Sequence, residues 1–192
     1  MKRHRDELFA GAMGVMAARD RRQAEPCPQD LMRALCGHLT ETGGREVRLM
    51  LEPFPPDTVS GLWIDLGDHE VVAVEKNTLP LHQMVILGHE LWHRKEAETG
   101  RAAAVPGGAG PAGATGGAGA AAAAARLLGD RWSLGEAIAH VAARADHDPD
   151  EERRAERFGR LLAAKFLPFL LGTRTSRPPD ALVGRMRTAL GR

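Results

Sequence analysis

The chain has 192 residues, of which 43% are hydrophobic and 27% are charged, and its formal net charge is +1 at pH 7. This composition is typical of a globular protein with one or at most two domains. The small net charge argues against direct binding to nucleic acid, since proteins of that class carry a basic excess. No stretch approaches the roughly 18 apolar residues of a membrane span, and the chain lacks the apolar run of a secretory signal. We therefore expect a cytoplasmic protein without a membrane or nucleic-acid partner.

The first 98 residues contain two predicted helices followed by three predicted strands. Apolar residues recur at helical spacing in the helices and alternate with other residues in the strands, at residues 6–22, 29–40, 46–54, 61–66 and 70–74. Gly43-Gly44 ends the second helix, and Gly67-Asp68 predicts a hairpin-like turn between the last two strands. The sequence therefore predicts a small antiparallel sheet preceded by two helices.

Residues 79–98 predict a further helix, which carries the sequence His89-Glu90-Leu91-Trp92-His93 at its centre. Because residues four apart lie on one helix face, His89 and His93 can present two imidazoles to one Zn²⁺ ion. Glu90 lies one position round the helix, next to any water on the metal. Zinc would lower the pKa of that water towards about 7, and the glutamate would take its proton. The pattern predicts two metal ligands and a general base.

A low-complexity segment divides the chain after this helix. Residues 99–125 are rich in Ala, Gly and Pro, a composition that predicts a flexible insertion. We therefore expect residues 1–98 to form the part with the H-E-x-x-H helix and residues 126–192 to form a helical part that supplies a further ligand. Helices are predicted in the second part at residues 132–143, 149–171 and 181–190, and Asp148 is the predicted N-cap of the middle one.

A catalytic zinc site of this type needs a third protein ligand. Thr99 stands where a third histidine would complete the extended pattern H-E-x-x-H-x-x-G-x-x-H, so the ligand must come from another element. The available groups further along the chain are Glu136, His140, His147, Glu151 and Glu152.

The helix that begins at residue 149 offers the best of these groups. Glu152 shares a helix face with Ala155 and Gly159, small residues that would allow close approach to another helix. Glu156, one turn on, is predicted to hydrogen-bond the second nitrogen of a ligating imidazole. Glu151 lies on a different face and is predicted to cap the helix.

Two motifs together resemble the ImmA/IrrE family of zinc metallopeptidases. The first is H-E-x-x-H at residues 89–93, and the second is Glu152–Gly159, which is similar to the family pattern E-x-x-A-[ND]-x-F-A. Leu167-Pro168 is similar to the end of the same family helix, and residues 61–93 resemble actinobacterial members that are toxin components. The resemblance covers roughly residues 26–170, with the low-complexity segment as an insertion.

The resemblance implies a zincin-like α+β fold with a small sheet, the H-E-x-x-H helix and a second ligand-bearing helix. It implies that His89, His93 and Glu152 are the three Zn²⁺ ligands. It implies that Glu90 is the general base. It also implies a helix-turn-helix repressor or an antitoxin as the protein partner. Three positions depart from the family pattern without removing a ligand, namely Trp92, Glu156 and Gly159. The Trp92 ring is expected near the site, where it could narrow substrate access or reposition the helix.

Peptide hydrolysis also needs a group that stabilises the oxyanion. The chain contains no tyrosine, which leaves His82, two turns before His89, and His147 as candidates. We expect a zinc-dependent endopeptidase that acts on a protein partner. The alternative is a zinc-stabilised regulatory or toxin module that binds its partner without cleaving it. The presence of Glu90 favours the enzyme, because a binding module would need only the ligands.

Overall fold

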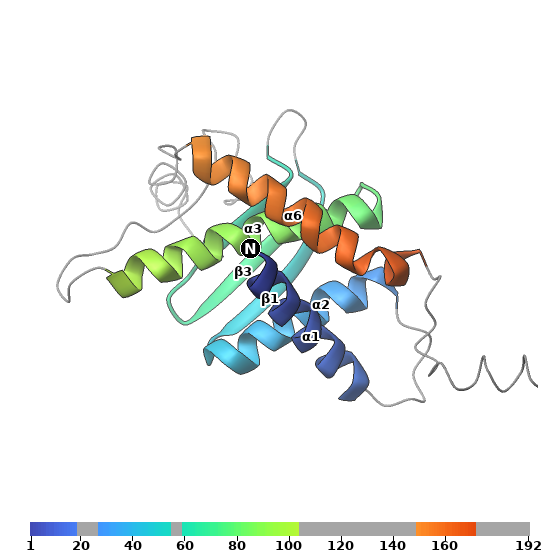
Figure 1. The fold of residues 1–192 in the computed structure, drawn as a ribbon, viewed down its shortest axis with the longest axis horizontal. Coiled ribbons are helices and arrows are strands. Elements are labelled where there is room, and N and C mark those ends of the chain that lie inside the picture. Colours follow the sequence, from blue (N-terminus) through green and yellow to red (C-terminus); the bar gives the residue numbers. More distant parts are fainter. Residues whose placement is uncertain (19–26, 55–58, 104–148, 172–192) are drawn as a thin grey trace, which may run out of the picture.

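The computed structural model describes residues 1–18, 27–54, 59–103 and 149–171, which form an α+β fold (Figure 1). Its elements in chain order are α1 (Lys2–Ala18), α2 (Pro28–Gly43), β1 (Glu46–Glu52), β2 (Gly61–Asp65), β3 (His69–Glu75), α3 (Pro80–Ala103) and α6 (Pro149–Leu170). Among these described residues, no helix is both long and apolar enough to cross a membrane.

Each predicted element of the first 98 residues is present with shifted ends, although residues 19–22 of the first predicted helix lie outside the described part. Helix α3 continues to Ala103, so residues 99–103 of the predicted insertion are helical, and residues 104–125 lie outside the described part. The predicted helices at residues 132–143 and 181–190 also lie outside it, as do three candidate site residues, Glu136, His140 and His147.

Local signals explain the ends of α2. At its beginning, the backbone N–H of Cys27 donates a hydrogen bond of 2.9 Å to the Asp30 carboxylate, and Pro28 occupies the first turn. At its end, Gly44 adopts a left-handed conformation with φ of 72°, and its N–H bonds the Thr40 carbonyl. A residue without a side chain takes this conformation at no steric cost, which is why the Gly43-Gly44 pair ends the helix as predicted.

The three strands form a mixed sheet in the order β1-β3-β2. Strand β2 pairs antiparallel with β3, as the predicted turn at Gly67-Asp68 requires, but β1 pairs parallel with β3. The predicted all-antiparallel sheet is therefore wrong for one of its two pairings. Alternation of side chains decides which residues face the core and is the same for both strand directions. Strand β1 ends at Glu52, which pairs with Glu75, and β2 begins at Gly61, which pairs with Val74, so the end of β1 and the start of β2 both lie at the C-terminal end of β3.

The main core lies on the face of the sheet that α2 and α3 cover. Helix α2 contacts β1, α3 contacts β2 and β3, and α6 crosses α3 (Figure 1). The largest side chains that are fully buried include Trp63 on β2, Met84 and Leu87 on α3, and Phe158 and Phe166 on α6. Helix α3 is thus held between the sheet and α6, and its two sides have different neighbours.

Two glycines set the distance between α3 and α6. A Cβ atom on Gly88 would lie 2.8 Å from the Cα of Gly159, and a Cβ atom on Gly159 would collide with the carbonyl oxygen of Val85. The helix backbones therefore touch at this crossing, which only residues without side chains permit. The predicted role of Gly159 in close helix approach agrees with this geometry.

Candidate metal centre

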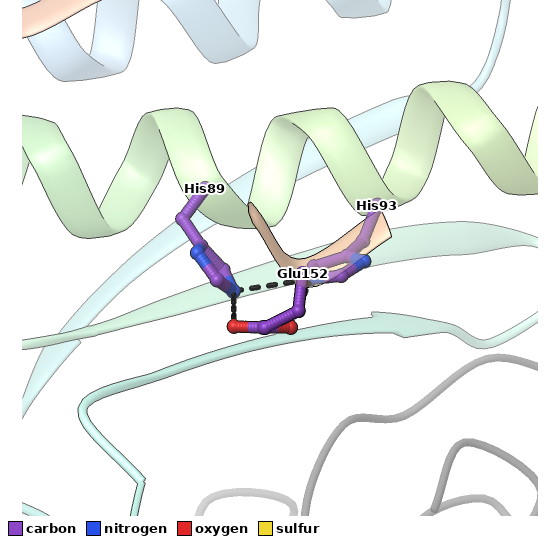
Figure 2. Close-up of side chains that lie close together, drawn as sticks. All are labelled: His89, His93 and Glu152. Atoms are coloured by element: carbon purple, nitrogen blue, oxygen red, sulfur yellow. Dashed lines mark hydrogen bonds and ion pairs between the residues drawn. The ribbon is translucent and has the colours of Figure 1, made fainter. Parts of the chain in front are cut away.

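His89 and His93 lie one turn apart on α3 and extend from the same side of the helix (Figure 2). Their ring centroids are 4.7 Å apart, and the two Nε2 atoms are 3.0 Å apart. The side chain of His93 is only 1% exposed, whereas that of His89 is 19% exposed. Both rings therefore direct the same nitrogen to one point at the edge of the α3–α6 interface.

Glu152, in the first turn of α6, reaches the same point (Figure 2). Its Oε1 atom is 3.2 Å from His89 Nε2, and its Oε2 atom is 3.5 Å from His93 Nε2. Gly159 lies seven residues further along α6, which is about two helical turns on the same side. The close crossing at Gly159 thus brings the first turn of α6 to the imidazoles, and the three predicted ligands are brought together.

The three side chains fit a metal ion in both spacing and chemistry. In a tetrahedral site with bonds of about 2.0 Å, neighbouring donor atoms lie about 3.3 Å apart. Here the two Nε2 atoms are 3.0 Å apart, and they lie 3.2 and 3.5 Å from the two different oxygens of the Glu152 carboxylate. Two imidazole nitrogens and a carboxylate oxygen form one of the donor sets of catalytic zinc sites. A shared proton can link only two of these atoms by a hydrogen bond, whereas one metal cation can be coordinated by all three.

Glu151 makes the contact that the sequence assigned to Glu156. The Oε1 atom of Glu151 is 3.1 Å from His93 Nδ1, the nitrogen on the far side of the ring. When that nitrogen carries the proton, its N–H donates to Glu151 and leaves the Nε2 lone pair for a metal. Glu156 instead forms an exposed ion pair of 3.1 Å with Arg160.

The orientation of α6 explains this correction. The face of α6 that packs on the rest of the protein carries Ala155, Phe158 and Leu162, all fully buried. Glu151 lies on this buried face, as the sequence indicated when it placed Glu151 with Phe158. Glu156 lies on the other side of Glu152, towards solvent. The sequence placed Glu151 and Phe158 on one face of α6. It missed that this face is the one that packs on α3 and therefore brings Glu151 to His93.

The remaining predicted residues lie outside this group of three. His82 is exposed in the first turn of α3, about 10 Å along the helix axis before His89. His147 lies outside the described residues. Trp92 does not narrow the site, because its ring is buried in the core and packs on Phe158 with ring centroids 5.1 Å apart. Its bulk acts on the packing of α3 against α6.

Glu90 lies on the side of α3 that faces β2. It is only 3% exposed, and its Oε2 atom accepts a hydrogen bond of 3.1 Å from the backbone N–H of Trp63. A buried carboxylate needs such a donor, because desolvation of an unpaired charge is unfavourable. The predicted general base is therefore fixed between the helix and the strand.

A second group of charged residues, which the sequence did not reveal, surrounds Glu70 on β3. The Glu70 carboxylate is 0% exposed and accepts hydrogen bonds from the indole N–H of Trp63 (2.8 Å) and from the guanidinium groups of Arg94 (2.7 Å) and Arg45 (2.6 Å). Arg45 also bonds Asp65, and this hydrogen bond raises the pKa of Arg45. We call these five residues the Glu70 cluster. Alternation along β3 offered a signal, since Glu70 shares its face with buried valines.

Comparisons of the chain with protein-family models, with curated proteins and with solved structures found no match. The resemblance to the ImmA/IrrE family therefore stays a prediction that rests on two short motifs and their order. The α+β class is confirmed by the described elements, and its zincin-like character remains an expectation.

Proposed function

We propose that the protein is a zinc-dependent metallopeptidase. The observation that carries the proposal is the convergence of two Nε2 atoms and one carboxylate, from His89, His93 and Glu152, within 4.8 Å of one another. Glu90 follows the first of these ligands on the same helix, as the general base of a metallopeptidase does. The side chain of Glu152 is 42% exposed, so the site lies at the surface of the part of the chain that the structure describes.

The residues of the site divide the work of hydrolysis among them. A zinc ion held by the three ligands would polarise a peptide carbonyl and make water more acidic. Glu90 would accept a proton from the attacking water and pass it to the nitrogen of the leaving amine, so that one water molecule is consumed for each bond cleaved. Glu151 would hold His93 in the tautomer that leaves Nε2 for the metal.

The resemblance of the two motifs supports a helix-turn-helix repressor or an antitoxin as the substrate, in the cytoplasm.

A second function is favoured by the bond between Glu90 and β2. Because the Glu90 carboxylate accepts the Trp63 N–H in a buried position, it also has a structural use. A zinc-stabilised module that binds its partner without cleavage would keep this bond and would not need proton transfer.

Metal content tests the ligands first. Elemental analysis of the purified chain should give one zinc per wild-type molecule, and less than a tenth of that in His89→Ala and Glu152→Ala. His82→Ala is the matched control, because it removes an exposed histidine from the same helix and should keep the full zinc content. A wild type that binds no added zinc would contradict the proposal.

Cleavage then separates the two functions. The wild type should hydrolyse members of a random decapeptide library, with the new amino termini identified by mass spectrometry. Glu90→Gln keeps an oxygen for the Trp63 N–H but removes the proton acceptor, so it should retain zinc and lose 10²-fold or more in rate. Equal cleavage by both proteins would exclude Glu90 as the base. Zinc binding by both without any cleavage would favour the binding module.

A further inference from the structure

The edge of β2 that meets Glu90 has an unusual local structure. Strand β2 lies at one edge of the sheet that the described residues form, and β3 is its only neighbour there. The ladder bonds Leu66 N–H to His69 O and Glu75 N–H to Ser60 O fix the alternation along the strand. By that alternation, the backbone groups of Gly61 and Trp63 point away from β3. The Glu90 carboxylate occupies part of this edge, where it accepts the N–H of Trp63.

Gly61 lies against the same carboxylate. A Cβ atom at this position would stand 2.9 Å from Glu90 Oε1 and 3.1 Å from Glu90 Cγ, both closer than ordinary carbon contacts. It would also collide with the Cγ2 methyl group of Ile86, one turn earlier on α3. Gly61 is itself buried, and its φ is not in the left-handed region, so space rather than backbone conformation requires glycine here.

We propose that Gly61 is a positioning residue for Glu90. The missing side chain at Gly61 leaves the space that the carboxylate fills, and the N–H of Trp63 fixes Oε2 in that space. The other oxygen, Oε1, is then the one left to accept a proton. This inference rests on the proposed function, in which Glu90 transfers a proton and its orientation therefore affects the rate. A general base that is already fixed in its reactive orientation avoids the entropy cost of reaching that orientation during the reaction.

The first experiment needs neither metal nor substrate. The metal-free protein is labelled with ¹⁵N-tryptophan, which gives three backbone amide signals, and Trp63→Phe identifies the one from residue 63. In Glu90→Ala the exchange of this amide with solvent should become at least tenfold faster, whereas Glu90→Gln should preserve slow exchange. Gly61→Ala should behave like Glu90→Ala. An amide that exchanges equally slowly in the wild type, Glu90→Ala and Gly61→Ala overturns the proposal.

The second experiment separates positioning from packing. Gly61→Ala should keep one zinc per chain and lose 10²-fold or more in kcat on a cleaved library peptide, with KM within about threefold. Gly61→Ala/Ile86→Ala removes the collision with Ile86 and leaves the one with Glu90, so kcat should stay low, whereas Ile86→Ala alone should keep most of it. Recovery of kcat in the double variant, or loss of zinc in Gly61→Ala, overturns the proposal.

The two experiments also tell this inference apart from the proposed function. If the wild type hydrolyses no peptide, or Glu90→Gln hydrolyses as fast as the wild type, the proposed function fails, and the Trp63 amide still reports whether Gly61 orients Glu90. If Gly61→Ala does not fold, the comparison of Glu90→Ala with Glu90→Gln still decides whether the carboxylate is fixed at Trp63. Unchanged exchange in Glu90→Ala would then overturn the inference.

Discussion

His93 and Arg94 are neighbours on α3, yet their side chains belong to two groups of opposite character. His93 belongs with His89, Glu151 and Glu152 to a group that we call the histidine cluster. Arg94 belongs to the Glu70 cluster. In the Glu70 cluster, N–H donors from guanidinium and indole groups surround a fully buried carboxylate, so the charges are matched within the chain. In the histidine cluster, nitrogen and carboxylate atoms that coordinate metals converge near the surface.

The comparison shows that one helix carries two different groups of polar side chains on its two sides. The side of α3 that faces the sheet is completed by the protein itself, and we interpret it as structural. The side that faces the first turn of α6 carries three potential metal ligands, and we propose that a cation completes it. The two clusters should therefore respond differently to mutation: the Glu70 cluster in folding stability, and the histidine cluster in metal affinity.

The largest effect is expected at Glu70. In Glu70→Gln the buried Arg94 loses its buried counter-charge and keeps only the exposed Glu98, which should lower the free energy of unfolding by about 3–5 kcal/mol. Glu98→Gln is the matched control, since Glu98 pairs with the same Arg94 at 2.9 Å but is 44% exposed, and it should cost about 0–1 kcal/mol. Urea denaturation of the metal-free proteins measures both. Equal losses would show that the Glu70 cluster adds no more than a surface ion pair.

The next effect is expected at the crossing of α3 and α6, which positions Glu152 of the histidine cluster beside the two imidazoles. Gly159→Ala forces the helices apart, which should cost about 1–3 kcal/mol and weaken zinc binding, because Glu152 moves with α6. Gly14→Ala is the control on an exposed part of α1 with no atom near the new Cβ, and it should stabilise by about 0.5–1 kcal/mol. Urea denaturation and zinc titration measure the two responses. Unchanged zinc affinity in Gly159→Ala would contradict the proposed link.

A smaller effect should decide between the two carboxylates that were considered for His93. Glu151→Ala removes the contact with His93 Nδ1 and should weaken zinc binding about 10- to 100-fold. Glu156→Ala removes only an exposed pair with Arg160 and should leave the zinc affinity unchanged. Competition with a chelator of known affinity measures both variants. The reverse result would restore the role that the sequence assigned to Glu156.

The sequence was sufficient where a function depends on spacing within one helix. The four-residue interval between His89 and His93 fixes both rings on one face of any helix, and the small residues after Glu152 indicated a close helix contact. In the described part of the chain, helix and strand positions also followed from local periodicity. The choice of Glu152 over its neighbour Glu151 also agrees with the group of three that the structure brings together.

The sequence was insufficient where the outcome depends on how elements are oriented in space. Strand alternation is the same in parallel and antiparallel pairs, so the direction of β1 against β3 could not be derived. The contact of Glu151 with His93 depends on which face of α6 meets α3. The Glu70 cluster joins residues from four separate segments, and only the buried position of Glu70 in an alternating strand gave a sign of it.

The smallest effect concerns His4, a histidine that neither cluster contains. Its ring stacks on Phe158 with centroids 5.3 Å apart, and burial, with a contribution from the nearby Lys95, lowers its pKa from 6.5 to about 4. Below pH 6.5 the unfolded chain therefore binds a proton that the folded chain does not, so stability falls as the pH falls towards 4. Because the ring is partly exposed, solvent screening should reduce the loss between pH 7 and pH 5 to about 1 kcal/mol.

His4→Phe keeps the stacking and removes this loss. Urea denaturation in the presence of a metal chelator measures the free energy of unfolding of both proteins. From pH 7 to pH 5 this free energy should fall less in the variant than in the wild type. From pH 8 to pH 7 the difference between the two proteins should stay constant. A difference independent of pH would mean that His4 takes up its proton in the folded state as readily as in the unfolded one. In that case, the burial of the His4 ring against Phe158 would not disfavour its protonated form.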